Sequence, residues 1–343
     1  MLKNSKGYKG FTLIELMVAI AIASAVLAAI YSVFIMQQRT QVSEQVAVDM
    51  QQTLRAAMYL IERDIRMAGY DPTRTWGLDG KDNDGDFLFD EADEKQTDKE
   101  LDTIDNDGDG SIDGADADGE ALGIVSAGPH TIEMTMDLDG DRMYTGSNER
   151  IRYGFAFAYD ADGNGIADLN KGGAAPLGRA VGAGSPQSMA EDIQAVAFSY
   201  AYDYDAGAPI ESLDRLLDTS PGGNVIWAFD SDGDRLLDRI LDTNDDGLID
   251  GRDIPGGQDL TGMGWETAYV PLNRIRAVRV WLLARARVPL KNYTDTATYI
   301  IGDKHIDVRD SNGDGVVDAS DKPDNFKRRL LSATIKCRNL GLE

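Results

Sequence analysis

The chain has 343 residues, of which 42% are apolar, so it is long enough to bury a hydrophobic core in one or two domains. Its formal charge of −25 argues against a nucleic-acid partner, and its single Cys and two His exclude a disulfide framework, a Cys-based zinc site and a His-dominated transition-metal centre. The 59 acidic residues are 46 Asp and 13 Glu, an excess of Asp that is typical of turns and of oxygen ligands for hard cations.

The amino terminus begins with a basic leader, residues 1–10, which carries three lysines. An apolar run follows from Phe11 to Met36 and contains one charged residue, Glu15. As a helix rising about 1.5 Å per residue, this run is long enough to cross a bilayer core of about 30 Å. The lysines lie before the run and none follows it closely, which predicts that the leader stays in the cytoplasm while the rest of the chain crosses the membrane.

Glu15 argues against a simple membrane anchor, because a carboxylate in a spanning helix is costly unless a partner neutralises it. The residues from Lys9 to Leu16 closely resemble the type III signal of type IV pilins and type II secretion pseudopilins. The resemblance implies that a prepilin peptidase cuts after Gly10 and methylates the new terminal Phe11. It also implies that Glu15 meets the terminal amine of a neighbouring subunit during filament assembly. The chain would then sit in the inner membrane with its head in the periplasm, and later enter the pilus.

The helical pattern continues beyond the apolar run, where apolar residues recur at spacings of three and four: Val42, Val46, Met50, Leu54, Met58, Ile61 and Ile65. We expect the helix to end at Ala68 or Gly69, because Asp71-Pro72 follows. The sequence thus predicts a membrane or filament-core half at 11–36, an amphipathic half at 37–69 and a globular head at 70–343.

Alternating apolar segments in the head predict antiparallel strands at 131–136, 151–159, 193–202, 275–283 and 331–337. One long helix followed by strands favours an α+β class, with an antiparallel sheet packed on the helix as in the pilin fold. The aromatic stripe of Tyr153, Phe155, Phe157 and Tyr159 indicates core positions rather than a ligand site. Asp-rich segments with few strand signals are interpreted as insertions, at about 79–120, 203–262 and 303–325.

The insertions repeat a calcium-loop template, which has side-chain oxygens at positions 1, 3, 5, 9 and 12, a backbone carbonyl at position 7 and often Gly at position 6. Three stretches satisfy every position. Their ligands would be Asp105, Asp107, Asp109, Ser111, Asp113 and Asp116; Asp242, Asn244, Asp246, Leu248, Asp250 and Asp253; and Asp310, Asn312, Asp314, Val316, Asp318 and Asp321. Each stretch has an aliphatic residue at position 8 that we expect to turn inward: Ile112, Ile249 and Val317.

Four further stretches match the template in part. One stretch has a carboxylate at every side-chain ligand position, but it has Phe87 where the template has Gly: Asp82, Asp84, Asp86, Asp90 and Asp93. A second lacks an oxygen at position 12, although Asp242 lies one residue beyond and could be shared: Asp230, Asp232, Asp234 and Asp238. The others are Asp160, Asp162, Asn164 and Asp168, with Lys171 at position 12, and Asp137, Asp139 and Asp141, followed by Thr145 and Asn148.

The competing interpretation of all seven stretches is ordinary Asp-Gly turn chemistry. Calcium is favoured because carboxylates folded within about 5 Å of one another repel strongly unless a divalent cation lies between them. The complete loops also resemble those of dockerin modules and other extracellular calcium repeats. Such sites bind weakly, with dissociation constants on the order of 10⁻⁴ to 10⁻³ M, and would still fill outside the cell.

Segments 63–70, 149–153, 275–285 and 328–340 resemble a PilW-type minor pilin of type IV pilus assembly. The resemblance implies a low-abundance subunit that joins other minor pilins and the major pilin, through the inner-membrane assembly machinery, in a complex that primes pilus polymerisation or sits at the tip. A type II secretion pseudopilin would share the leader, and a calcium-dependent tip adhesin would use the loops, so both remain alternatives. An enzyme is the weakest interpretation, since the sequence has no nucleophile with a plausible base and no phosphate loop.

Overall fold

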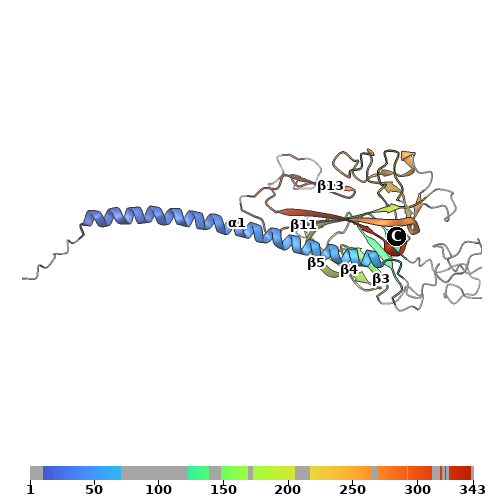
Figure 1. Ribbon diagram of the computed structural model, residues 1–343, viewed down its shortest axis with the longest axis horizontal. Coiled ribbons are helices and arrows are strands. Elements are labelled where there is room, and N and C mark those ends of the chain that lie inside the picture. The colour runs from blue at the N-terminus through green and yellow to red at the C-terminus, as the bar shows by residue number, and fades with distance from the viewer. Residues whose placement is uncertain are drawn as a thin grey trace, which may run out of the picture. The chain divides into compact units, whose positions relative to one another are not determined.

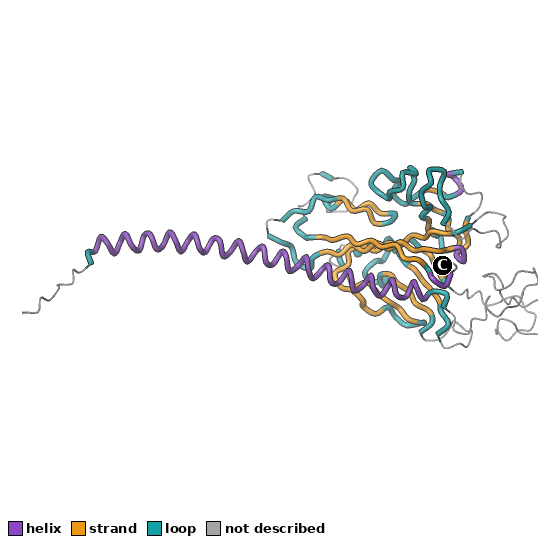
Figure 2. Tube along the Cα trace, in the orientation of Figure 1, coloured by secondary structure: helices purple, strands orange, loops and turns teal. Residues whose placement is uncertain are grey.

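The computed structural model describes residues 11–70, 123–138, 148–168, 173–204, 217–264, 269–291, 293–310, 317–318, 321 and 324–340. The chain divides into two compact units, 1–49 and 50–343. One long helix and a set of antiparallel strands make up most of the regular structure of the described residues (Figure 1; Figure 2).

Helix α1 spans Leu13–Met67, which confirms the long amino-terminal helix. Among the described residues it is the helix that is long and apolar enough to cross a membrane. Of the expected stripe, Met50, Leu54, Met58, Ile61 and Ile65 are buried, together with Ala57 and Asp64, whereas Val46 is half-buried and Val42 is 50% exposed. The helix ends because Gly69 adopts a left-handed conformation with φ of 75°, and its N–H donates to the Thr135 carbonyl at 3.0 Å instead of continuing the helix.

Over the described residues, the main sheet is antiparallel and has ten strands. Eight follow one another in the order β1 (Ile124–Ala127), β2 (Ile132–Thr135), β3 (Arg150–Gly154), β4 (Ala175–Val181), β5 (Gln187–Tyr202), β6 (Ala228–Phe229), β8 (Arg239–Ile240) and β9 (Gln258–Asp259). β11 (Ile275–Arg285) pairs with β5 on one side and with β14 (Arg328–Lys336) on the other.

Two small two-stranded sheets complete the strands of the described residues: β7 (Leu236–Leu237) with β10 (Val270–Pro271), and the hairpin of β12 (Thr298–Ile301) with β13 (Lys304–Asp307). The described residues also include three short 3₁₀ helices, η3 (Thr261–Met263), η4 (Leu272–Arg274) and η5 (Arg338–Leu340). The predicted α+β class, with a helix packed on an antiparallel sheet, is therefore confirmed.

A buried carboxylate joins α1 to the sheet. Asp64 is 3% exposed, and one of its oxygens accepts hydrogen bonds from the Tyr153 hydroxyl at 2.6 Å and from Arg179 Nε at 2.7 Å. Tyr153 and Arg179 are cross-strand partners in β3 and β4, so both side chains lie on the same face of the sheet. Burial and the nearby Asp64 raise the pKa of Tyr153 well above its usual range. The tyrosine therefore acts as a neutral hydrogen-bond donor at this joint.

The β12–β13 hairpin packs against the centre of the main sheet. At the hairpin turn Gly302 has φ of 59°, and a Cβ there would lie 2.6 Å from the Ala197 side chain in β5. The next residue, Asp303, lies 2.8 Å from His130 Nε2, and His130 Nδ1 lies 3.0 Å from the Gly163 carbonyl. His130 thus connects the hairpin to the segment around residue 163.

The strand expected at 151–159 is wrong beyond its first half, because β3 ends at Gly154. The chain then turns, with the Tyr159 N–H donating to the Ala156 carbonyl at 2.8 Å. Phe157, which we expected in the core, sits on this turn and is 80% exposed. The aromatic residues continue to alternate at every second position as far as Tyr159, although the strand itself ends at Gly154.

Candidate functional site

The start of α1 contains a reciprocal pair, Thr12 and Glu15. The Glu15 carboxylate accepts hydrogen bonds from the Thr12 N–H and from the Thr12 hydroxyl, both at 2.8 Å, and the Glu15 N–H donates to that hydroxyl at 3.3 Å. This is a capping box, which satisfies N–H groups left open at a helix start. We did not expect it from the sequence, although Thr-x-x-Glu before an apolar run is its signature.

Of the two residues expected at the processing site, the structure describes Phe11, which is 87% exposed. Gly10 lies outside the described residues. Within its own chain Glu15 already has Thr12 as a partner. The pairing of Glu15 with a neighbour's terminal amine therefore stays a prediction.

Three of the Asp-rich loops share one hydrogen-bonding pattern. We call them loop 160 (described over 160–168), loop 230 (230–241) and loop 242 (242–253). In each loop the N–H at position 6 donates to the carboxylate at position 1: Gly165 to Asp160 at 2.9 Å, Arg235 to Asp230 at 3.0 Å, and Gly247 to Asp242 at 2.7 Å. The position-6 residues are left-handed, with φ of 75°, 70° and 81°. Loop 230 holds this conformation without a glycine.

The pattern extends along each loop. The N–H at position 7 donates to the side-chain oxygen at position 5: Ile166 to Asn164 at 2.8 Å, Leu236 to Asp234 at 2.9 Å, and Leu248 to Asp246 at 3.0 Å. The N–H at position 5 donates to position 3: Asn164 to Asp162 at 3.2 Å, Asp234 to Asp232 at 3.1 Å, and Asp246 to Asn244 at 3.0 Å. The side chains at positions 1, 3 and 5 are therefore all held on the inner side of the turn.

The carboxylates at position 1 are buried: Asp160 is 8%, Asp230 4% and Asp242 7% exposed. Burial raises the pKa of each of these three groups above its usual value, although backbone N–H groups partly offset the effect. An ionised carboxylate at this position is thus costly, and a cation beside it would lower the cost.

Loop 230 brings its first three acids together. Asp230, Asp232 and Asp234 each offer a carboxylate oxygen, and these oxygens lie within 4.8 Å of one another, close enough to bind one metal ion. Asp238, the expected fourth ligand, accepts hydrogen bonds from Ser231 at 2.8 and 2.6 Å. Asp242 instead accepts from Asp246 and Gly247, so it belongs to loop 242.

Loop 242 is closed by its position-12 residue. Asp253 is 5% exposed and accepts hydrogen bonds from the N–H groups of Thr243 and Asp250, both at 2.8 Å. One residue earlier, Arg252 places a guanidinium nitrogen 2.8 Å from Asp246 and 2.6 Å from Asp250. The template gave no role to Arg252, which supplies an internal positive charge to two expected ligands.

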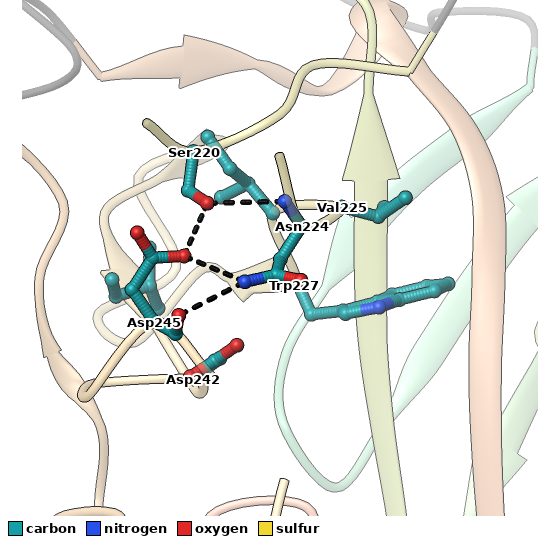
Figure 3. A pocket seen from close by; sticks show the side chains of 8 residues that line it. Ser220, Asn224, Val225, Trp227, Asp242 and Asp245 are labelled. Atoms are coloured by element: carbon teal, nitrogen blue, oxygen red, sulfur yellow. Dashed lines mark hydrogen bonds between the residues drawn. The ribbon is translucent and has the colours of Figure 1, made fainter. Parts of the chain in front are cut away.

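A side chain outside the template fixes loop 242 to the segment before β6. Asp245, at position 4, accepts hydrogen bonds from the Ser220 hydroxyl and from Asn224 at 2.9 Å (Figure 3). It also accepts one from the Gly222 N–H at 2.9 Å. The cavity beside these residues has a volume of about 10 Å³, room for roughly one water molecule. It is too small for an organic ligand, and the hydrogen bonds to Asp245 are what position the loop.

The fourth loop with described residues, loop 310 (310–321), repeats the closing bond of loop 242. The Asp318 N–H donates to Asp321 at 2.8 Å, as Asp250 does to Asp253. Asn312, Asp314 and Val316 fall outside the described residues, as do all ligands of the stretches 82–93 and 105–116. In the stretch that begins at Asp137 the structure describes the two end residues, and Asp137 is buried with its N–H on the Tyr70 carbonyl at 2.7 Å.

The position-8 side chains are not all inward as expected. Val317 is 49% exposed and Ile249 is half-buried. Ala167 of loop 160 and Leu237 of loop 230 are buried because their backbones pair with neighbouring strands: the Ala167 N–H donates to Gln194 at 2.8 Å, and Leu237 lies in β7. Val317 lies in no described strand.

Two family models of known proteins match parts of this chain. A family model described as a prokaryotic N-terminal methylation motif matches residues 5–31. The model of the type IV pilus-assembly protein W family matches residues 157–339, a little more than half of the chain. The chain belongs to the type IV pilus-assembly protein W family. The match includes segment 275–285 and all but the last residue of segment 328–340, whose resemblance we noted, and spans loops 160, 230, 242 and 310.

Among solved structures, a type IV-like pilin from Thermus thermophilus shares 13% identity with a TM-score of 0.26, covering 63% of this chain and 83% of the other. No curated protein matches the chain. Family membership, the methylation motif and the apolar helix identify a type IV pilin of pilus assembly that is anchored in a membrane and incorporated into the pilus.

Proposed function

We propose that this protein is a minor pilin that joins other minor pilins and the major pilin in the complex that primes the pilus or forms its tip. The observation that carries the proposal is the presence, in one chain, of the methylation motif at 5–31, the apolar helix α1 and the family match over 157–339. Its role is structural rather than enzymatic. The prepilin peptidase cuts after Gly10, and the inner-membrane machinery then draws the subunit into the filament with its head on the periplasmic side.

Deleting the gene for the protein and counting surface pili by electron microscopy tests this role. We expect a large loss of pili that the wild-type gene restores and a Gly10→Val gene does not, because the unprocessed subunit stays in the membrane. Growth conditions that block pilus retraction separate failed priming from excessive retraction. Normal pilus numbers combined with lost protein secretion would contradict the proposal and favour a secretion pseudopilin.

We further propose that loops 230 and 242 bind calcium and stabilise the head. Three observations support this: the shared turn geometry, the buried carboxylates at position 1, and the three converging oxygens of loop 230. The ligands would be Asp230, Asp232, Asp234, the Leu236 carbonyl and Asp238 in loop 230, and Asp242, Asn244, Asp246, the Leu248 carbonyl, Asp250 and Asp253 in loop 242. The same sequence pattern extends the proposal to the stretches 82–93, 105–116 and 310–321.

Bound calcium would have a structural task in this part of the head. β6, β7, β8 and β9 have two residues each, so the segment that carries loops 230 and 242 gains little from strand pairing. A bound divalent ion would instead neutralise the carboxylates and close each turn, and its binding energy would add directly to folding.

Isothermal calorimetry on the full chain in detergent micelles tests the calcium proposal. We expect saturable binding with dissociation constants on the order of 10⁻⁴ to 10⁻³ M, and weaker binding of magnesium, which requires a smaller octahedral site. Heat signals indistinguishable from buffer across millimolar calcium would overturn the proposal and leave the loops as acidic turns.

A further inference from the structure

Strand β14 is a long strand with a neighbour on one side. It pairs with β11 over its whole length, from Lys336 opposite Ala277 to Arg328 opposite Arg285. Within the described part of the chain, no other strand pairs with β14. A nine-residue edge of this kind offers a row of backbone hydrogen-bonding groups to another chain.

The register shows which groups face outward. Beyond one end of the pair the Cys337 N–H donates to the Arg276 carbonyl at 2.9 Å, and beyond the other the Ala286 N–H donates to the Lys327 carbonyl at 2.8 Å. Hydrogen-bonded and non-hydrogen-bonded pairs alternate along an antiparallel ladder, so the odd-numbered residues of β14 bond to β11. The N–H and C=O groups that point away from β11 belong to the even-numbered residues Leu330, Ser332, Thr334 and Lys336.

This edge is open at its side chains as well. Ser332, Thr334 and Lys336 are exposed, and Leu330 is half-buried. The strand's first residue is different, because Arg328 is 8% exposed and its guanidinium is engaged by Asp295 at 3.2 Å and by Asp324 at 2.5 Å. The accessible edge therefore runs from Leu330 to Lys336.

The charge of the edge selects its partner. Between residues 325 and 340 the chain has no acidic residue, although its net charge is −25. The bases in this window are Lys327, Arg328, Arg329, Lys336 and Arg338, of which Arg329, Lys336 and Arg338 are exposed. Two β14 strands would repel each other, which disfavours pairing between copies of this chain. An extended segment that carries acidic side chains would instead be attracted.

We propose that the outer edge of β14 accepts an extended acidic strand from the head of a different pilin, which extends the main sheet across the subunit boundary. The added strand exchanges backbone hydrogen bonds with Leu330, Ser332, Thr334 and Lys336, and its acidic side chains lie beside Arg329 and Lys336. The inference rests on the proposed minor-pilin function and names the chemistry of the partner that this function requires.

A photo-cross-linking residue in place of Thr334, in the full chain expressed with the complete set of pilus proteins, tests the proposal. We expect adducts that map to one extended acidic segment in another pilin's head. Ser332→Pro should reduce these adducts at least tenfold, because proline removes an outward N–H while leaving the β11 ladder intact. The matched variant Ser332→Ala keeps the N–H and should leave the adducts unchanged.

A second pair of variants acts without proline. Arg329→Glu with Lys336→Glu should lower the adduct yield several-fold, whereas Arg287→Glu, an exposed basic residue outside the edge, should not. Circular dichroism of each full-length variant checks that the fold persists. Adducts that map to this chain itself, to a second copy or to a partner's loop would overturn the proposal, as would a yield unaffected by both sets of variants.

Immunodetection of the wild-type protein in the same purified pili separates this inference from the proposed function. If the protein is present in pili and the adducts fail as described, the edge pairing is wrong while the pilin role stands. If the protein is absent from pili, the proposed function itself is contradicted.

Discussion

Asp64 is the residue on which the joint between α1 and the sheet depends most. Its side chain is 4% exposed and meets both Tyr153 and Arg179. Asp64→Asn should lower the free energy of unfolding by about 3 kcal/mol, because it leaves a partly buried arginine without its counter-charge and weakens the tyrosine hydrogen bond. Urea unfolding of the full chain measures the effect. Glu62→Gln, which removes only an exposed pair with Arg66, is the matched control and should cost about 0.5 kcal/mol or less.

Glu15 has two possible roles that single substitutions can separate. If it acts only through the capping box with Thr12, then Thr12→Ala and Glu15→Gln should both have small effects, since a lost cap costs about 1 kcal/mol. If its charge pairs with a neighbouring subunit's terminal amine, Glu15→Gln should sharply reduce incorporation into pili while Thr12→Ala retains it. Quantitative immunoblots of sheared pili against membrane fractions measure the ratio. Equal incorporation of Glu15→Gln and wild type would refute the pairing.

At the scale of elements, periodicity predicted the long helix and four of the strands because each carries its own pattern. The predicted helix over 11–69 exceeds α1 by two residues at each end, and the apolar run, the apolar stripe and Gly69 account for this agreement. β4 was not predicted, because Pro176 and Gly178 interrupt the alternation of apolar residues along it. Pairing with β3 and β5 stabilises it as a strand. Phe157 shows the opposite failure, where alternation without a pairing partner did not make a strand.

In the Asp-rich loops, too, some features could be predicted from the sequence and others depend on tertiary contacts. Spacing alone identified the backbone turn, because the carboxylate at position 1 and the left-handed residue at position 6 are only five residues apart in the sequence. Arg252 and Asp245 could not be assigned from the template, since their roles depend on contacts with Asp250 and with Ser220, which the fold brings together.

Calcium should stabilise the head through individual loops. Thermal unfolding of the full chain should shift upward in millimolar calcium relative to chelator, because an ion bound only to the folded state adds about 2.7 kcal/mol per site at a hundredfold excess over Kd. Asp246→Asn with Asp250→Asn should remove the increment of loop 242 and leave that of the others. The exposed Glu191→Gln should keep the full increment. A calcium shift unchanged in the double variant would show that loop 242 holds no ion.

Calcium stabilisation should also depend on pH, because burial raises the pKa of Asp230 and Asp242 above the usual 3.8. A carboxyl group whose pKa is higher in the folded state contributes stability that is fully present at a pH below its pKa in the unfolded state. This contribution is lost as the pH rises through its pKa in the folded state. In chelator, stability from these groups should therefore decline from about pH 4 upward, while calcium compensates the ionised form. Melting curves at pH 4.5 and pH 7 should show the larger calcium increment at pH 7. A larger increment at the acidic pH would have the wrong sign.

For the whole molecule, the distribution of charge and polarity follows the assembly route. The apolar first part of α1 suits a membrane or filament core, the Asp-rich loops suit an exterior that contains calcium, and the basic β14 edge suits a neighbouring head. Each of these assignments requires that the leader be removed and that the subunit enter a filament.

Mass spectrometry of this protein from purified pili tests that requirement most directly. The account predicts a single mature form that begins with methylated Phe11 and lacks residues 1–10, because the peptidase acts before assembly. Recovery of the protein from pili with Met1 and the leader still attached would contradict the account.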